Sequence, residues 1–122
     1  MQRVIFDSSF LMAVAENPTT WFQDIVQGLG SFEPILPACV RDELSKMALG
    51  RGKRARGARV ALELAANFAT ISCGMAAVDD EIVSAALTKE AAIATTDSDL
   101  ALSAKAAHLR VVLLRSGRVA FG

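Results

Sequence analysis

The first strong pattern in the chain is Arg-Val-Ile-Phe-Asp-Ser-Ser at residues 3–9. The β-branched and aromatic run at 3–6 predicts a short strand, and an acidic residue, Asp7, stands where that strand ends. Continuous apolar runs of this length are typical of strands that are covered on both faces, as in parallel sheets. The stretch therefore predicts the central strand of an α/β domain, with Asp7 at its carboxyl end.

Outward from this stretch, helical and strand patterns alternate about five times with short connections. Further strands are expected at 34–37, 69–71, 92–95 and 111–114, and residues 119–121 could add an edge strand. Helices are expected at 10–15, 21–29, 38–48, 60–68, 78–87 and 97–107. Such alternation builds a parallel sheet with helices on both faces. We therefore predict a three-layer α/β/α fold with a parallel sheet of about five strands. Because the chain has 122 residues and no internal repeat or linker, we expect one domain over 1–122.

The overall charge and the cysteines exclude several classes of protein. Thirteen Lys and Arg balance thirteen Asp and Glu, so the net charge gives no general attraction to nucleic acid or to anionic membranes. No apolar segment reaches the roughly 18–20 residues that span a bilayer, and we expect no targeting segment.

Cys39 and Cys73 lie 34 residues apart with no CxxC pair or clustered His, which argues against a disulfide scaffold and against structural zinc. A reducing, cytoplasmic location fits this pattern best.

Acidic residues gather where the predicted strands end and the predicted helices begin. In an open parallel sheet this edge is where ligands bind. Several carboxylates that share one crevice repel one another, so either some are protonated or a divalent cation neutralises them. Mg²⁺ or Mn²⁺ prefers oxygen ligands and can activate a water beside a phosphate. The residues concerned are Asp7, Glu43, Asp79, Asp80, Asp97 and Asp99.

Each acidic residue alone has a simpler interpretation. Asp79, Asp80 and Asp97 are plausible helix N-caps, Glu43 could lie on a solvated helix face, and Asp7 could hold a turn. Their shared position at one edge favours a common site. The sequence does not favour a serine hydrolase, a P-loop protein or a dinucleotide-binding enzyme, because it has no nucleophile elbow, P-loop or dinucleotide-binding motif. The single histidine, His108, is expected on the surface rather than in a catalytic role.

Four segments, in chain order, resemble the PIN-domain nucleases. They are Val-Ile-Phe-Asp-Ser-Ser at 4–9, Val-Arg-Asp-Glu-Leu at 40–44, Val-Asp-Asp-Glu-Ile at 78–82 and Ala-Thr-Thr-Asp-Ser-Asp-Leu at 94–100. The resemblance covers nearly the whole chain. It departs at 105–108, where a Gly would be expected before the last strand, and this affects a turn rather than the acidic site.

The resemblance implies a function and a set of site residues. It implies a metal cluster of Asp7, Glu43, Asp79 and Asp97 for Mg²⁺ or Mn²⁺, with Asp99 as an accessory carboxylate. Asp79 is preferred to Asp80 because its eighteen-residue distance to Asp97 is similar to the family's spacing. Small polar residues, Thr95 and Ser8 or Ser9, would orient the acids and water. Such domains cleave single-stranded RNA, many as VapC-type toxins held by an antitoxin and others in the trimming of ribosomal RNA precursors. They commonly form homodimers.

Residues 51–59 contain five basic residues and no acidic one, whereas residues 79–99 contain six acidic residues and one Lys. The neutral total therefore hides a separation of charge. The basic segment is either a flexible, solvated loop or an arm that binds RNA phosphates, and the resemblance to the archaeal ribosomal-RNA branch rests on it. Its basic residues are Arg51, Lys53, Arg54, Arg56 and Arg59. With one Trp, no Tyr and six Phe expected to be mostly buried, we predict recognition of the RNA backbone rather than of bases.

Two rival functions remain. A phosphohydrolase or receiver-like domain also places acids at strand ends, but it would need a second Asp at the position of Ser9 or paired acids before an acceptor Asp. The other rival is a catalytically inactive PIN domain that binds RNA or protein.

Overall fold

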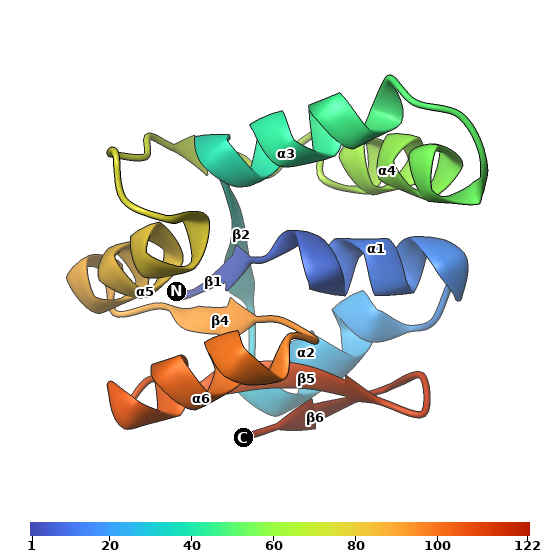
Figure 1. The fold of residues 1–122 in the computed structure, drawn as a ribbon. Coiled ribbons are helices and arrows are strands. Elements are labelled where there is room, and N and C mark those ends of the chain that lie inside the picture. The colour runs from blue at the N-terminus through green and yellow to red at the C-terminus, as the bar shows by residue number, and fades with distance from the viewer.

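The structure, a computed structural model, describes all residues from 1 to 122. Strands and helices alternate through most of the chain (Figure 1). Their order is β1 (Gln2–Phe6), α1 (Ser8–Glu16), α2 (Trp21–Leu29), β2 (Phe32–Pro37), α3 (Ala38–Ala48), α4 (Lys53–Leu64), β3 (Ala69–Ile71), α5 (Val78–Lys89), β4 (Ala92–Ala94), α6 (Ser98–Ala106), β5 (Val111–Arg115) and β6 (Arg118–Phe121).

The six strands form one sheet in the order β3-β2-β1-β4-β5-β6. The first five are parallel, and β6 pairs with β5 in the antiparallel direction. This confirms the α/β class, the central place of β1 and the edge strand that residues 119–121 could add, which is antiparallel to the other five. The strand order reverses between β1 and β4, which pair through Val4 with Ala92 and Phe6 with Ala94. The crevice at such a reversal is where open α/β sheets bind ligands.

The centre of the sheet is covered on both faces, because the consecutive residues Val4, Ile5 and Phe6 are all fully buried. Phe6 lies in an aromatic cluster with Phe10, Trp21, Phe32 and Phe68. The three-layer arrangement predicted from the alternation of elements is therefore confirmed.

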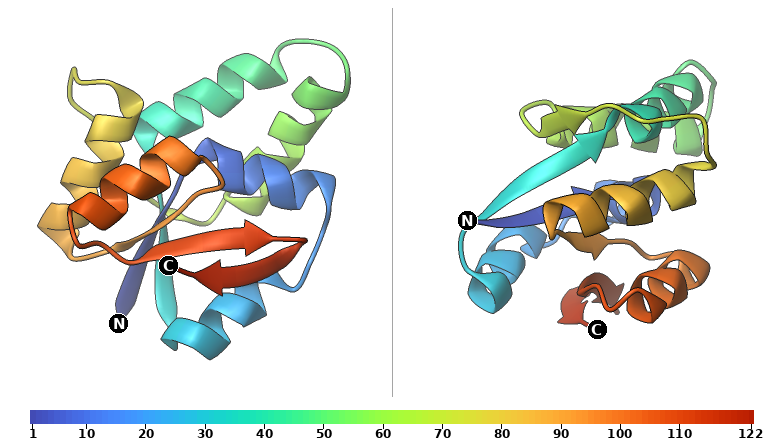
Figure 2. Two further views of the ribbon diagram at one scale, coloured as in Figure 1. Left: turned by 60° about the horizontal axis from the view of Figure 1, so that its bottom comes forward. Right: turned by 90° about the vertical axis from the view of Figure 1, so that its left-hand side faces the viewer.

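Two groups of helices stand beside the sheet (Figure 2). Helices α1, α3 and α4 pack on one another, whereas α5 packs on β1, β4 and α6. Helix α2 packs on β6. No helix is both long enough and apolar enough to cross a membrane.

Helix α4 starts earlier than the sequence suggested. It begins at Lys53, so most of the basic segment at 51–59 is helical rather than a loop. Ala55, Ala58 and Ala61 are buried at helical spacing, and this stripe packs α4 against its neighbours. The interpretation of the segment as a flexible loop is wrong, because Ala55 and Ala58 within it are buried on one face of a helix.

Most of the phenylalanines are buried or packed on the core, as expected, and Phe22 and Phe121 are the exposed exceptions. Two smaller expectations were wrong. Leu87, expected to point inward from α5, is about half exposed. Cys39 and Cys73 form a disulfide, with their Cα atoms 5.9 Å apart. The sequence could not show this pairing because the two residues meet only through the parallel pairing of β2 with β3.

The departure at 105–108 has a simple structural basis. His108 is exposed, as expected, and has a φ of 60°, in the left-handed region that favours glycine. The turn before β5 therefore keeps the backbone conformation for which a Gly was expected, with a His in its place.

Candidate functional site

The site is built around Asp7, which directly follows β1 and is 6% exposed. Its backbone N–H donates to the carbonyl oxygen of Ala94, so the end of β1 is joined to the end of β4. Its carboxylate Oδ2 accepts hydrogen bonds from Ser9 Oγ at 2.6 Å and from Thr95 Oγ1 at 2.9 Å. Both donors contact Oδ2, which leaves Oδ1 as the oxygen available to a ligand. Asp7 is thus a fixed carboxylate at the reversal of strand order.

Ser9 and Thr95 connect Asp7 to the loop after β4. Thr95 is fully buried, and its Oγ1 accepts from the backbone N–H of Asp97 at 3.0 Å. Ser9 Oγ accepts from the N–H of Thr96 at 3.0 Å. Each hydroxyl gives its only proton to Asp7, so the 3.1 Å approach between the two hydroxyl oxygens adds no third hydrogen bond. Of the two serines, only Ser9 donates to Asp7, and both serines line a neighbouring cavity.

Asp97 is the N-cap of α6. Its Oδ1 caps α6 by accepting from the N–H groups of Asp99 at 2.8 Å and Leu100 at 3.1 Å. The capping interpretation is therefore confirmed for Asp97, and the same bonds hold the carboxylate beside Asp7. A cap position does not exclude a ligand role, because the bonded oxygen is Oδ1 and Oδ2 stays free.

Asp79 and Asp80 do not cap α5. The N-cap is Ala77, which makes no side-chain hydrogen bond, and the two acids lie in the first turn. Partial burial raises the pKa of the Asp79 carboxyl above its ordinary 3.8, and the negative charges of Asp7, Asp97, Glu43 and Asp80 raise it further. The carboxylates at the ends of β1 and β4 and on α3 are therefore close enough to Asp79 to repel its charge.

Of the other acids, Glu43 joins this group and Asp99 does not. Glu43 lies on α3 and acts on the pKa of Asp79, as the sequence predicted for a shared site. Asp99 is exposed in the first turn of α6 and is not among the charges that raise that pKa. Asp80 is among them as well; the sequence counted it with the acids at this edge, preferred Asp79 as the ligand and left Asp80 as a candidate cap.

A cavity of about 590 Å³ opens beside Glu43, between α1, α3 and α4. Its lining combines polar groups with apolar side chains, and Arg54 is the only basic residue in it. The apolar residues Met12 and Met47 were not predicted; Met47 follows Glu43 by one helical turn, which was the available signal. The lining residues are Ser8, Ser9, Met12, Ala13, Glu16, Glu43, Met47 and Arg54.

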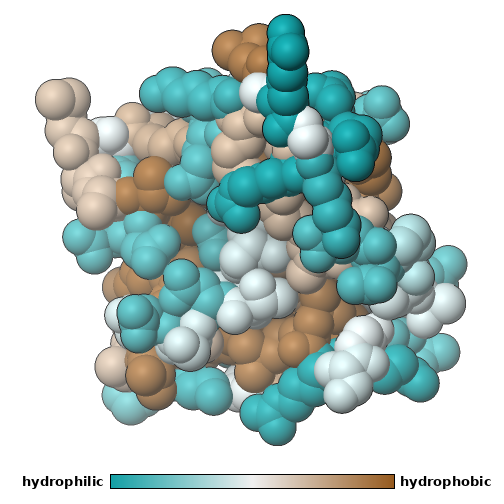
Figure 3. Space-filling model, turned by 45° about the vertical axis from the view of Figure 1, so that its right-hand side comes forward, coloured by the Kyte–Doolittle hydropathy of each residue, from teal (hydrophilic) through white to brown (hydrophobic).

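The basic residues do not all have the same position. Arg51, Lys53, Arg54 and Arg56 are exposed, at or near the start of α4. Arg59 donates through Nη1 to the carbonyl oxygen of Ala48 at 2.7 Å, so it joins α4 to the end of α3. Figure 3 shows hydrophilic side chains gathered over the α3–α4 part of the molecule, at the top of that view.

The carboxylates approach one another, but they are not arranged as a finished ligand set. No group of three or more His, Cys, Asp or Glu side chains is placed to hold one metal ion. The donors are nonetheless all oxygens. After burial, the second cause of the raised pKa of Asp79 is repulsion by neighbouring carboxylates, which a divalent cation would relieve. Because Mg²⁺ needs only one or two direct carboxylates and keeps several waters, these residues fit such an ion.

Comparison with known proteins gives one family and several similar folds. Residues 4–117 match a family described as a PIN-like domain. No curated protein matches the chain. The structure is similar to that of the PIN domain endonuclease Utp24, with 23% identity, a TM-score of 0.80 and coverage of 98% of this chain and 90% of that chain.

Two archaeal structures share the fold at lower similarity. A domain of a functionally unknown protein from Methanocaldococcus jannaschii has 19% identity, a TM-score of 0.66 and coverage of 95% of this chain and 93% of its own. A protein from Pyrobaculum aerophilum has 17% identity, a TM-score of 0.53 and coverage of 81% and 77%. At these identities the structural matches establish the fold.

Proposed function

The chain belongs to the PIN-like domain family, and from that premise we propose that it is an endonuclease that hydrolyses phosphodiester bonds in single-stranded RNA with Mg²⁺ or Mn²⁺. The observation that carries the proposal is the position of Asp7 at the reversal of strand order, where Ser9 and Thr95 join its carboxylate to the loop that leads to Asp97. The pKa of Asp79 agrees with a shared site, because burial raises it first and the charges of neighbouring acids, Asp7 among them, raise it further.

The proposed ligands of the cation are Asp7, Glu43, Asp79 and Asp97. When bound, a divalent cation supplies positive charge at the attacked phosphate and a water of lowered pKa. The chain itself fixes two of these carboxylates. Ser9 and Thr95 hold Asp7, and the capping bonds hold Asp97. Ordered carboxylates bind a cation at less entropic cost than mobile ones.

Arg54 and the start of α4 would hold the RNA backbone. Arg54 lines the same cavity as Glu43 and Ser9, so a phosphate bound there would lie near the acids. Arg51, Lys53 and Arg56 add positive charge nearby, where the acidic edge alone would repel RNA. Arg59 already donates to Ala48, so we assign it a structural role in addition to its charge.

The test is cleavage of a fluorescently labelled single-stranded RNA with Mn²⁺. Asp7→Asn should abolish cleavage and weaken Mn²⁺ binding, because the amide has a similar shape but no charge. Glu63→Gln, an exposed acid elsewhere on α4, is the matched control and should cleave like the natural chain. Circular dichroism verifies that both variants fold. Full activity of the Asp7→Asn variant would refute the assignment.

One observation favours a second candidate, an inactive PIN-like domain that binds RNA or protein. It is the absence of a finished three-residue metal set. Calorimetric titration with Mn²⁺ separates the two functions. Binding that is lost in Asp97→Asn supports the nuclease, whereas no binding, or binding that survives the substitution, supports the inactive module.

The biological context stays a prediction. A toxin would have an antitoxin partner, whereas a ribosomal-RNA processing domain would act without one. Size-exclusion chromatography with light scattering tests the expected homodimer. The location in the cytoplasm also stays a prediction.

A further inference from the structure

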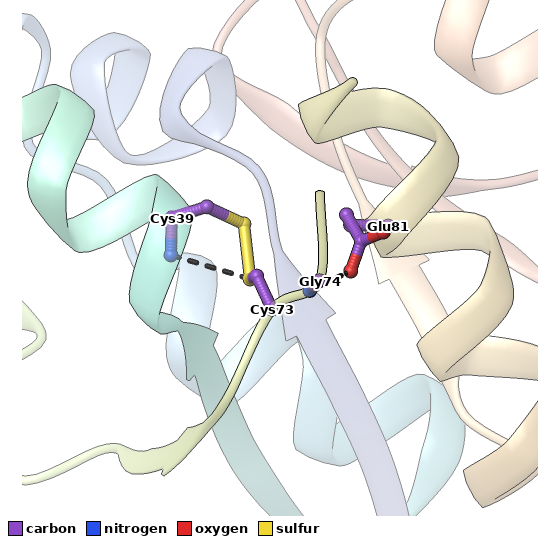
Figure 4. The surroundings of a disulfide bond; sticks show 4 residues. All are labelled: Cys39, Cys73, Gly74 and Glu81. Carbon is purple, nitrogen blue, oxygen red and sulfur yellow. Dashed lines mark hydrogen bonds between the residues drawn. A yellow bond between two sulfur atoms is a disulfide. The ribbon is translucent and has the colours of Figure 1, made fainter. Parts of the chain in front are cut away.

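The disulfide between Cys39 and Cys73 joins the start of α3 to the segment before α5 (Figure 4). Cys39 is in the first turn of α3, one helical turn before Glu43. Cys73 is in the segment 72–77, which leads from β3 into α5 and to Asp79. A second cavity, of about 480 Å³, directly connects these parts of the fold: it is lined by Cys39, Asp42, Glu43, Lys46, Met47 and Val78.

This disulfide joins two groups of helices that otherwise share few contacts. Helix α3 packs on α1, α4 and β2, whereas α5 packs on β1, β4 and α6. Glu43 belongs to the first group and Asp79 to the second. The covalent bond is therefore a direct tie across the site between the elements that carry these two acids.

The segment before α5 has little else to fix it. Residues 74–77 are all exposed, and Met75 is fully so. Ala77 at the N-cap makes no side-chain hydrogen bond. Two hydrogen bonds add to the disulfide: the Cys39 N–H donates to Cys73 Sγ, and the Gly74 N–H donates to the Glu81 carboxylate within the same segment and helix. Without the disulfide, the start of α5 would lose its covalent attachment to α3.

We propose that the Cys39–Cys73 disulfide is a redox control of the acidic site: the oxidised form holds Asp79 near Glu43, and reduction releases the segment 72–77. The proposal rests on the proposed function, because it names the regulation of that site. A dithiol is the reductant. It gives two electrons and two protons, the Cys39–Cys73 bond breaks, two thiols form, and the dithiol becomes a disulfide.

The surroundings of the two sulfurs allow this exchange. Both cysteines are only partly buried, so a dithiol can reach them. The N–H of Cys39 donates to Cys73 Sγ at 3.3 Å, and the N-terminus of α3 lies beside it. Attack at Cys39 Sγ expels Cys73 as a thiolate, and both features stabilise a thiolate. Cys73 is therefore a favourable leaving group when a dithiol attacks Cys39 Sγ.

The test compares Mn²⁺ binding by the full chain before and after reduction with dithiothreitol. Supporting groups around a metal site typically change affinity by about 10–100-fold, so we expect Mn²⁺ to bind at least about tenfold more weakly to the reduced form. Hydrogen exchange gives a readout that needs no metal: amides in 72–80 should exchange faster after reduction, and those of β1 should not. Equal affinity together with equal exchange in the two forms would overturn the proposal.

Two variants separate control of the site from general destabilisation. Cys39→Ser combined with Cys73→Ser should bind Mn²⁺ like the reduced form and should not respond to dithiothreitol. Ile25→Val, in the buried face of α2, which packs on β6 and carries no site residue, should lower the melting temperature and leave Mn²⁺ affinity unchanged. If the serine variant does not fold, the reduced natural chain gives the same comparison.

The failure of the proposed function can be recognised separately. If neither redox form binds Mn²⁺, the nuclease assignment fails, and hydrogen exchange alone decides the redox proposal. Faster exchange confined to 72–80 on reduction would support it, and unchanged exchange there would refute it.

Discussion

Thr95 offers the sharpest test of how the fold positions the acidic site. It is fully buried, and its hydroxyl makes two hydrogen bonds. It donates to Asp7 Oδ2 at 2.9 Å and accepts from the N–H of Asp97 at 3.0 Å. Thr95→Val keeps the size and branching of the side chain and removes only the hydroxyl. The substitution therefore separates the polar link from packing.

The expected loss of stability follows from these two bonds. A hydrogen bond to a charged group contributes about 1.5–3 kcal/mol and a neutral one about 1 kcal/mol, and the added methyl group offsets part of the loss. We expect the free energy of unfolding to fall by about 2.5 kcal/mol. At about 2.1 cal/mol/K per residue, unfolding 122 residues has an entropy of about 0.26 kcal/mol/K. The melting temperature should thus fall by about 10 °C.

Thermal unfolding followed by circular dichroism, without metal, measures this change. Thr95→Ser is the matched control, since it keeps the hydroxyl and loses a methyl group, at a cost of about 1 kcal/mol. Thr95→Val should also weaken Mn²⁺ binding, whereas Thr95→Ser should retain it. The reasoning would be refuted if valine left the melting temperature unchanged, or if serine cost as much as valine in both measurements.

The remaining predictions concern charge, RNA and the backbone. Because burial first, and then repulsion by neighbouring acids, raises the pKa of Asp79 in the folded state, the cost of its charge to stability is absent below pH 3.8 and is fully present above the raised value. Asp79→Asn should therefore raise the melting temperature of the metal-free protein at pH 7, with a gain that disappears as the pH falls below 3.8; a gain that persists in acid would contradict this cause. Arg54→Ala should weaken RNA binding and reduce the slope of affinity against salt by about one, as measured by fluorescence anisotropy, and an unchanged slope would remove Arg54 from the interface. His108→Gly should stabilise the fold by up to about 1 kcal/mol in urea unfolding, because glycine adopts a positive φ without a steric penalty; a loss of stability would show that the His side chain contributes more than its backbone costs.

The parts of the fold that sequence could predict are those with local signals. The continuous apolar runs at 4–6 and 91–94 mark β1 and β4, and the acids after them mark the edge at which the strand order reverses. Asp79 could be preferred to Asp80 only through a family spacing. The structure adds a physical reason, since the pKa of Asp79 responds to the other acids.

The parts that sequence could not predict depend on contacts between distant residues. The basic charges at 51–59 suggested a loop, because the burial of Ala55 and Ala58 exists only when α4 packs on its neighbours. The Cys39–Cys73 bond requires β3 to lie beside β2. The choice of Ser9 over Ser8 depends on which hydroxyl reaches Asp7, and adjacent residues on a helix point in different directions.

The positions of the two chain ends affect how the domain can be attached to something else. Met1 precedes β1, and Gly122 exchanges backbone hydrogen bonds with Val111, the first residue of β5 (Figure 1). Both ends therefore lie at the amino edge of the parallel strands, whereas Asp7 follows the carboxyl end of β1. A surface, a label or a second protein joined through either end would leave the acidic edge facing outward, open to a long polymer that approaches from solution.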